Sequence, residues 1–272
     1  MKVHFLGTAA AEGFPNVFCR CNACLEARKL GGKNIRTRSS VIIDDIIKFD
    51  YSPDSSMQAL RDGIDLGSIE HLLFTHTHCD HFIPEDLFCR VEEYAHGLEA
   101  PMKIYGNDAV ITRSYAELGI YGGNRLAFQL VRPFRPFTFG DTVVTPLPAD
   151  HDRNETCLLY YVERGGKRLF YGHDTGWFPE DTWEWLKDKK IDLAILDCTH
   201  GFTGNNRNSG HMNIETVLEV QREWREQGVI NENSQLYVTH FTHNSGMLHD
   251  DWEKAFAPAG IRVAYDGLVI NV

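Results

Sequence analysis

The chain has 272 residues, of which 43% are hydrophobic and 24% are charged. This length and apolar share predict one globular domain with a sizeable core. The formal net charge is -11 and no block of Lys or Arg stands out, which disfavours a long nucleic acid as substrate because such a footprint needs clustered cations.

The sequence also bears on the cellular compartment. No signal-peptide segment opens the chain, and no apolar run of about 18 residues occurs in it. The seven cysteines are an odd number, and three of them lie within six residues, which favours metal binding in a reducing compartment over disulfides. We therefore expect a cytoplasmic protein without a membrane partner, and a homodimer is compatible with the sequence.

The N-terminal region combines a strand, a loop and a cysteine cluster. Residues 2–7 predict a strand, and the small-residue loop 7–13 predicts an active-site wall, since it lacks the Lys of a phosphate-binding loop. Cys19, Cys21 and Cys24 follow in a C-x-C-x-x-C pattern. Zinc prefers four tetrahedral ligands, so three thiolates leave one ligand to be found elsewhere in the chain. The alternative is three reduced thiols in a surface loop.

The strongest signal is the stretch 72–81, an apolar strand that runs into four potential ligands. Alternate residues of a strand share a face, so His76 and His78 can grip one metal. Asp80 and His81 lie past the strand, where a turn can aim them at a second metal. Burying so many polar groups without a metal would be costly. Before this stretch, a hairpin over 39–50 ends at Asp50, which can cap a helix over 55–62.

The middle of the chain supplies two further candidate residues. His151 follows a predicted strand, and Asp174 follows the second strand of a hairpin. The predicted elements here are a helix over 84–96, a strand over 102–105, a helix over 108–118, a lid or edge loop over 119–139, a strand over 142–146 and hairpin strands over 156–163 and 168–171.

The C-terminal third contains three more histidines of interest. A buried strand over 191–198 and a Gly- and Asn-rich loop over 201–210 precede His211, which lies just before a helix over 214–227. A helix N-terminus is a good place to meet an anion. Arg207 in the loop either offers a bidentate fork to a second phosphate or is merely solvated. A strand over 236–239 then runs into His240 and His243, and a helix over 250–257 and a strand over 261–265 follow.

Taken in order, these residues resemble the metallo-β-lactamase superfamily along nearly the whole chain. The resemblance implies a single α/β domain over residues 1–272, an αββα sandwich with metal ligands on loops at one edge. It implies that Asp50 orients the metal-binding loop from outside the ligand sphere. It assigns two active-site metals, Zn²⁺ or Mn²⁺, to these ligands: His76, His78 and His151 for one metal, Asp80, His81 and His240 for the other, and Asp174 as the bridge.

Three further features resemble the phosphodiesterase family of the phosphonate-degradation pathway, whose members open phosphoribosyl cyclic phosphate. They are the three cysteines, His211 before its helix and the pair of His240 and His243. This resemblance implies one structural Zn²⁺ held by Cys19, Cys21, Cys24 and His243. The metallo-β-lactamase-like family of pyrroloquinoline-quinone biosynthesis has a similar cysteine cluster, but it lacks the complete H-x-H-x-D-H pattern.

The ligand set predicts a metal-dependent hydrolase. Two metals clamp a phosphoryl oxygen and hold a hydroxide that forms near neutral pH. We expect the substrate to be a small cyclic phosphodiester, of the phosphoribosyl 1,2-cyclic phosphate or cyclic nucleotide type. Asp80 serves catalysis as a metal ligand, and His211 protonates the leaving oxygen or donates to the phosphate, unless it is only a helix-cap contact. The alternatives are a lactonase or thioesterase-type enzyme and a quinone-cofactor biosynthetic metalloenzyme.

Overall fold

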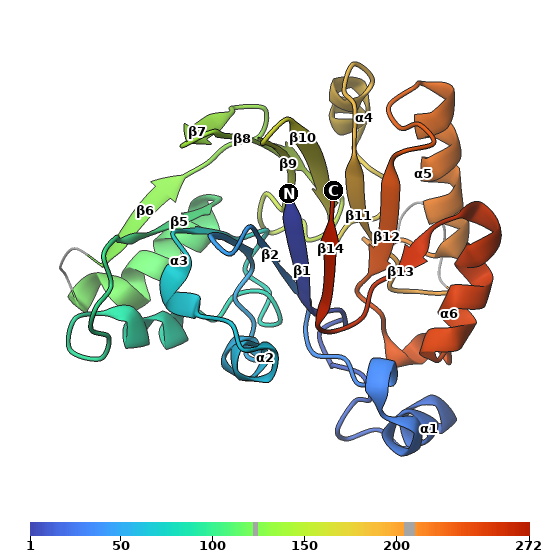
Figure 1. Cartoon of the computed structure of the whole chain (residues 1–272), viewed down its shortest axis with the longest axis horizontal. Helices are drawn as coiled ribbons and strands as arrows, with labels where there is room; N and C mark the ends of the chain where they lie inside the picture. Colours follow the sequence, from blue (N-terminus) through green and yellow to red (C-terminus); the bar gives the residue numbers. More distant parts are fainter. Residues whose placement is uncertain (122–124, 204–209) are drawn as a thin grey trace.

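The computed structural model describes residues 1–121, 125–203 and 210–272 (Figure 1). Within these residues two seven-stranded sheets face each other and helices cover their outer faces, so the predicted αββα sandwich is confirmed. No described helix is long and apolar enough to cross a membrane.

Both sheets are mixed, and their strands pair with one another in the following order. The first sheet contains β14 (Leu268–Asn271), β1 (Lys2–Gly7), β2 (Ser40–Ile43), β3 (Ile47–Phe49), β4 (His71–Leu73), β5 (Met102–Gly106) and β6 (Leu126–Leu130). The second sheet contains β13 (Arg262–Val263), β12 (Gln235–Thr239), β11 (Leu193–Asp197), β10 (Lys167–Gly172), β9 (Leu158–Arg164), β8 (Thr142–Pro148) and β7 (Phe137–Phe139).

The helices divide between the two sheets. On the outside of the first sheet lie α2 (Ser55–Asp62) and α3 (Asp108–Leu118). The second sheet is covered by α4 (Glu180–Leu186), α5 (Ile214–Glu226) and α6 (His249–Phe256). The remaining helix, α1 (Asn22–Leu30), lies at one end of the sandwich, apart from both faces (Figure 1).

The core follows from strand periodicity. Successive side chains of a strand point to opposite faces, so each buried strand feeds two apolar layers. In β9, Tyr160 and Val162 pack between the sheets, whereas Tyr161 packs outward under the helices of the second sheet. In β3, Ile47 and Phe49 point between the sheets. This double burial explains why many of the strands read as continuous apolar runs rather than as alternating patterns.

Parallel pairing brings several strand ends to one edge. Phe49 of β3 pairs with Leu73 of β4, so the segments after both strands emerge together. In the second sheet Gly172 of β10 pairs with Leu196 of β11, and Asp197 pairs with Thr239 of β12. The residues that directly follow these strands therefore meet at one end of the sandwich.

Two sequence predictions about local structure were wrong. The expected helix over 84–96 is only a 3₁₀ segment, Pro84–Arg90, and the chain is extended again at Val91. Arg90 donates to the backbone oxygens of Leu66, Gly67 and Ala100, and these tertiary contacts replace a continued helical turn. The second concerns Asp50, because the residue at the N-cap of α2 is Asp54 rather than Asp50.

The segment 119–139, expected as a lid or edge loop, connects the two sheets. Its described residues include β6 at the edge of the first sheet and β7 at the edge of the second. Two further elements were not predicted from the sequence: α4, a seven-residue helix after Pro179, and β14, which pairs antiparallel with β1. Each is too short to show a clear period of its own.

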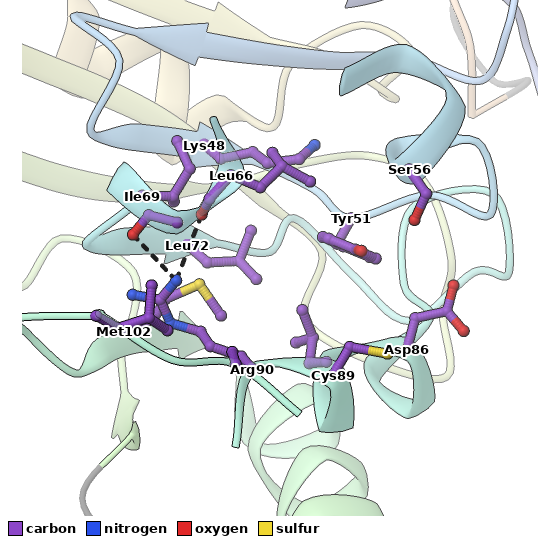
Figure 2. Close-up of a pocket in the computed structure, with 14 residues that line it drawn as sticks. Lys48, Tyr51, Ser56, Leu66, Ile69, Leu72, Asp86, Cys89, Arg90 and Met102 are labelled. Carbon is purple, nitrogen blue, oxygen red and sulfur yellow. Dashed lines mark hydrogen bonds between the residues drawn. The ribbon is translucent and has the colours of Figure 1, made fainter. Parts of the chain in front are cut away.

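A buried lysine lies behind the metal-binding loop. Lys48 points away from the inner core and is 1% exposed, at the wall of a cavity of about 250 Å³ lined largely by apolar side chains (Figure 2). Its Nζ donates to the hydroxyl of Ser40 and, at 2.7 Å, to the backbone oxygen of Asp50. No described carboxylate lies within ion-pair distance of it. Burial lowers the pKa of Lys48 from 10.5 to about 7.

This pKa predicts a pH-dependent stability. Between about pH 7 and 10.5 the unfolded chain binds a proton at Lys48 that the folded chain does not. The free energy of unfolding should therefore rise with pH in this window, by up to ~1.4 kcal/mol per pH unit from this group alone. Urea unfolding between pH 6.5 and 9 measures the slope, which Lys48→Met should reduce. Lys103→Met, an exposed lysine on β5, is the control, and equal slopes in the two variants would contradict the assignment.

Candidate metal centre

Asp50 fixes the start of the predicted metal-binding loop. Its Oδ1 accepts from the backbone N–H of Thr75 at 2.8 Å, and its Oδ2 lies 2.9 Å from Nδ1 of His81. The backbone of Asp50 has a φ of 57°, a left-handed conformation that non-glycine residues seldom adopt. The backbone N–H of Tyr51 also donates to the backbone oxygen of His81. Asp50 thus orients the loop as the family resemblance implied.

The structure brings all seven predicted active-site ligands together in two groups that share Asp174. In each group the potential ligand atoms lie within 4.8 Å of one another. Oδ2 of Asp174 lies 2.9 Å from Nε2 of His81, and its Oδ1 lies 3.0 Å from Nε2 of His240. The first group is His76, His78, His151 and Asp174; the second is Asp80, His81, Asp174 and His240.

The donor atoms of these groups fit divalent cations. Within the described residues, the buried Nε2 atoms of His76, His81 and His240 and Oδ1 of Asp174 form no hydrogen bond of acceptable geometry, although the Asp174 carboxylate lies 2.9 to 3.4 Å from the three nitrogens. Leaving four buried polar atoms in this state is costly, and imidazole with carboxylate is a ligand set that suits Zn²⁺ or Mn²⁺. A shared carboxylate between two such groups fits two cations side by side.

The opposite nitrogen of most ligand rings is held by a neighbour. Nδ1 of His76 lies 2.9 Å from the hydroxyl of Thr75, and Nδ1 of His151 lies 2.9 Å from the backbone oxygen of Gly210. Nε2 of His78 lies 3.0 Å from Oδ2 of Asp152. Such contacts fix the ring orientation and the tautomer, so that the remaining nitrogen faces the metal position.

The buried carboxylate and imidazole groups of the ligand cluster shift one another's pKa values. Burial alone would raise the pKa of Asp174, but the neighbouring imidazoles, led by His240, lower it well below its ordinary range. Burial lowers the pKa of His76 well below its ordinary value, which keeps the lone pair on this ring. Burial would also lower the pKa of His240, but Asp174 raises it to about 10. Cations would displace the protons held there, so metal binding should release protons.

His211 lies beside the ligand cluster and is held by residues that the sequence analysis missed. Its Nδ1 is 2.8 Å from Oδ2 of Asp197 and 3.1 Å from the hydroxyl of Thr199. Burial lowers the pKa of His211, but the Asp197 carboxylate more than offsets this and raises it. The Thr199 hydroxyl also lies 2.7 Å from Nδ1 of His240. The sequence signal that could have pointed to Asp197 and Thr199 is an aspartate at the end of the otherwise apolar strand β11.

A cavity of about 240 Å³ opens onto the ligands and His211. The loop after β1 forms one wall with Ala10, Ala11 and Glu12, as the sequence predicted. His173, next to Asp174 in the sequence, is buried with its ring 4.7 Å from that of His240. Arg207, the predicted phosphate ligand, lies outside the described residues.

The three cysteines meet His243 at the end of the sandwich that carries α1. The four potential ligand atoms lie within 4.8 Å of one another, and Sγ of Cys21 is 3.7 Å from Nδ1 of His243. The backbone N–H of Cys24 donates to Sγ of Cys21, and this bond is the main cause that lowers the pKa of Cys21 to about 6. A thiolate near neutral pH is the form that binds zinc. Three sulfurs and one imidazole fit a closed tetrahedral site.

Metal analysis tests this third group. Protein purified without chelator should contain about three divalent metals per chain, because the Cys₃His set supplies a complete structural zinc sphere in addition to the two shared groups. Cys24→Ser should lower the content by about one metal while the active-site metals remain. Cys89→Ser, an exposed cysteine outside the cluster, is the control. Two metals in the unaltered protein, with all three cysteines alkylated in the folded state, would contradict the assignment.

Most of the chain matches a known protein family. Residues 47–241 match the family described as "Beta-lactamase superfamily domain". Among curated proteins, Coenzyme PQQ synthesis protein B of Klebsiella pneumoniae (strain 342) is 24% identical over an alignment of 308 positions, gaps included, which covers 100% of this chain and 98% of the relative.

Solved structures share the fold over the whole chain. A diphosphatase of the PhnP family superposes with a TM-score of 0.76 at 22% identity, covering 100% of this chain and 97% of that one. Zn²⁺-bound PqqB from Methylobacterium extorquens has a TM-score of 0.76 at 20% identity, with 100% of both chains covered. At such identities the likeness concerns the architecture.

Proposed function

The chain belongs to the β-lactamase superfamily and is a metal-dependent hydrolase, and from this premise we propose that it hydrolyses a small cyclic phosphodiester. The observation that carries the proposal is His211. An alkoxide leaving group on phosphorus needs a proton, and the paired imidazole of His211 lines the cavity beside both ligand groups.

Divalent cations in the two groups, Zn²⁺ or Mn²⁺, would lower the pKa of a water toward ~7 and draw electron density from phosphorus. The chain's own residues do the rest. Asp174 and Asp80 place their carboxylates between the imidazoles, and Asp50 and Thr199 hold His81 and His240 from behind. These contacts keep the ligand rings from turning during turnover.

His211 would supply the proton that the reaction needs. Asp197 accepts from Nδ1, so a protonated ring carries its second proton on Nε2. The attacking water gives one proton to solvent and its oxygen bonds to phosphorus, the bond between phosphorus and the leaving sugar oxygen breaks, and that oxygen takes the proton from His211. The product is a phosphomonoester with a free hydroxyl. His211 is then neutral and regains a proton from solvent, aided by Asp197, which raises its pKa.

The size and charge of the site support a small substrate. A cavity of about 240 Å³ suits a ribose-type cyclic phosphodiester, such as phosphoribosyl 1,2-cyclic phosphate or a 2′,3′-cyclic nucleotide. Among the described residues no Lys or Arg lines this cavity, and the net charge of -11 would repel a long polyanion away from the metals. A long RNA is therefore a poor candidate.

The deciding assay compares substrates at matched enzyme and metal. We expect turnover of 1,2-cyclic phosphoribose, 2′,3′-cyclic nucleotides and bis-p-nitrophenyl phosphate, with little activity on lactones, thioesters or a precursor transfer RNA. Efficient lactone or thioester hydrolysis with inert phosphodiesters would replace the proposal with a different hydrolase class.

A second candidate rests on the full-length similarity to Coenzyme PQQ synthesis protein B. In that case the protein is a metalloenzyme of quinone-cofactor biosynthesis and does not hydrolyse phosphodiesters. Oxygen consumption with a quinone precursor, in the absence of phosphodiester turnover, would favour this candidate. The two assays together separate the functions because each uses a substrate that the other enzyme class should ignore.

A further inference from the structure

Glu12 lies where the metal cavity meets the cysteine cluster. Its Oε1 accepts a hydrogen bond from the hydroxyl of Thr242 and lies 3.8 Å from Nε2 of His243. Glu12 and Thr242 both line the metal cavity. The Glu12 side chain is 25% exposed, so it is held on one side by the fold and open on the other.

The cavity wall around Glu12 is rich in hydrogen-bond acceptors. In the part of the chain that the structure describes, the lining consists of carboxylates, imidazoles and small or neutral residues, and Asn244 is beside Thr242. A carboxylate has about four acceptor positions, and the Thr242 hydroxyl uses one of them. Glu12 can therefore accept further hydrogen bonds from a group in the cavity.

The chemistry of that group follows from the charge. A hydroxyl donates to a carboxylate, and a hydrogen bond to a charged partner is stronger than one between neutral groups. A second phosphate near Glu12 would instead meet a like charge. This wall thus favours the polyhydroxyl part of a substrate over a deoxygenated or phosphorylated one.

We propose that Glu12 is a specificity-determining residue that accepts a hydrogen bond from a hydroxyl on the alcohol part of the phosphodiester substrate. The inference rests on the proposed phosphodiesterase function and narrows its substrate class to esters of a diol or sugar. It places any second phosphate of the substrate away from Glu12.

Three p-nitrophenyl phosphodiesters test this selection, because they share the leaving group and differ only in the retained alcohol. The alcohols are 3-hydroxypropyl, propyl, and propyl with a phosphate at carbon 3, so that no ester has a hydroxyl two carbons from the ester oxygen that could itself attack phosphorus. The unaltered enzyme should prefer the diol ester to the propyl ester by about tenfold in kcat/KM, the effect of one charged hydrogen bond. Glu12→Ala should remove this preference, so that the ratio of the two kcat/KM values falls to about one. Glu12→Gln should retain part of the preference and accept the phosphorylated ester better.

Thr242→Val is the matched control. It removes the bond that Thr242 donates to Glu12 but leaves the carboxylate, so the preference for the diol should persist. The metal content of each variant is measured in parallel, because Glu12 also lies near His243. An unchanged ratio of diol to propyl turnover in both Glu12 variants would overturn the inference, even if the metal of the cysteine cluster were lost. No turnover of any of the three esters by the unaltered enzyme would instead overturn the proposed function and the inference with it.

Discussion

Asp174→Ala should remove both active-site metals and abolish hydrolysis. Asp174 is the one residue shared by the two ligand groups, with an oxygen 2.9 Å from Nε2 of His81 and another 3.0 Å from Nε2 of His240. Its loss leaves each group with three ligands and removes the negative charge between them. The fall in kcat/KM should exceed the ~10–100-fold typical of changes outside the ligand sphere.

Elemental analysis and turnover of bis-p-nitrophenyl phosphate measure this result together. Asp80→Ala is the comparison, because Asp80 belongs to the second group alone. It should lower the content by about one metal, whereas Asp174→Ala should lower it by about two, since a carboxylate that joins two ions is lost from both spheres. The metal of the cysteine cluster should persist in each variant. Equal metal loss in the two variants would show that Asp174 does not bridge.

His211→Ala should retain its metals and lose turnover according to the leaving group. A general acid typically contributes ~10²–10⁴-fold, and an alkoxide leaving group should show this full loss. A p-nitrophenolate leaving group needs little protonation, so its rate should fall much less. The rates with the two leaving groups should differ because Asp197 holds His211 as a proton donor beside the ligand groups.

The leaving-group test has a matched control. His200→Ala alters a second histidine of the same cavity, whose ring lies 5.5 Å from that of His211. Burial lowers the pKa of His200, so it is a poorer donor. His200→Ala should lower the turnover of substrates with either leaving group to a similar extent, and less than His211→Ala lowers turnover with an alkoxide leaving group. Full activity of His211→Ala on a cyclic phosphodiester with an alkoxide leaving group would discard the general-acid role.

The sequence predicted those features of the fold that depend on residues close together along the chain. The apolar run from Leu72 to Thr75 was predicted as the strand that leads into the histidines, but β4 ends at Leu73 and His76 and His78 lie on the loop after it. Apolar strands buried on both faces are typical of the two-layer architecture. The helix over 214–227 was predicted, and α5 spans Ile214–Glu226 with Asn213 at its N-cap, whose side chain accepts from the backbone N–H of Thr216. Each of these features depends on residues a few positions apart.

The remaining features depend on partners distant in sequence. Asp197 ends β11 and contacts His211, which lies 14 residues later in the connection to α5, and no local spacing shows that contact. Arg90 likewise ends the 3₁₀ segment through carbonyls that lie 10 to 24 residues away. The seven active-site ligands were assigned through family resemblance, whereas Thr199 and Asp152, which support them, carry no such signature.

The metal ligands come from both halves of the sandwich. His76, His78, Asp80 and His81 follow a strand of the first sheet, whereas His151, Asp174 and His240 follow strands of the second. Each group therefore recruits side chains from both halves, and neither half can complete a binding position by itself. Bound metals would link the two sheets, and they could bind only when the two sheets pack against each other in the correct register. The protein would then become able to catalyse at the same step at which its two halves assemble correctly.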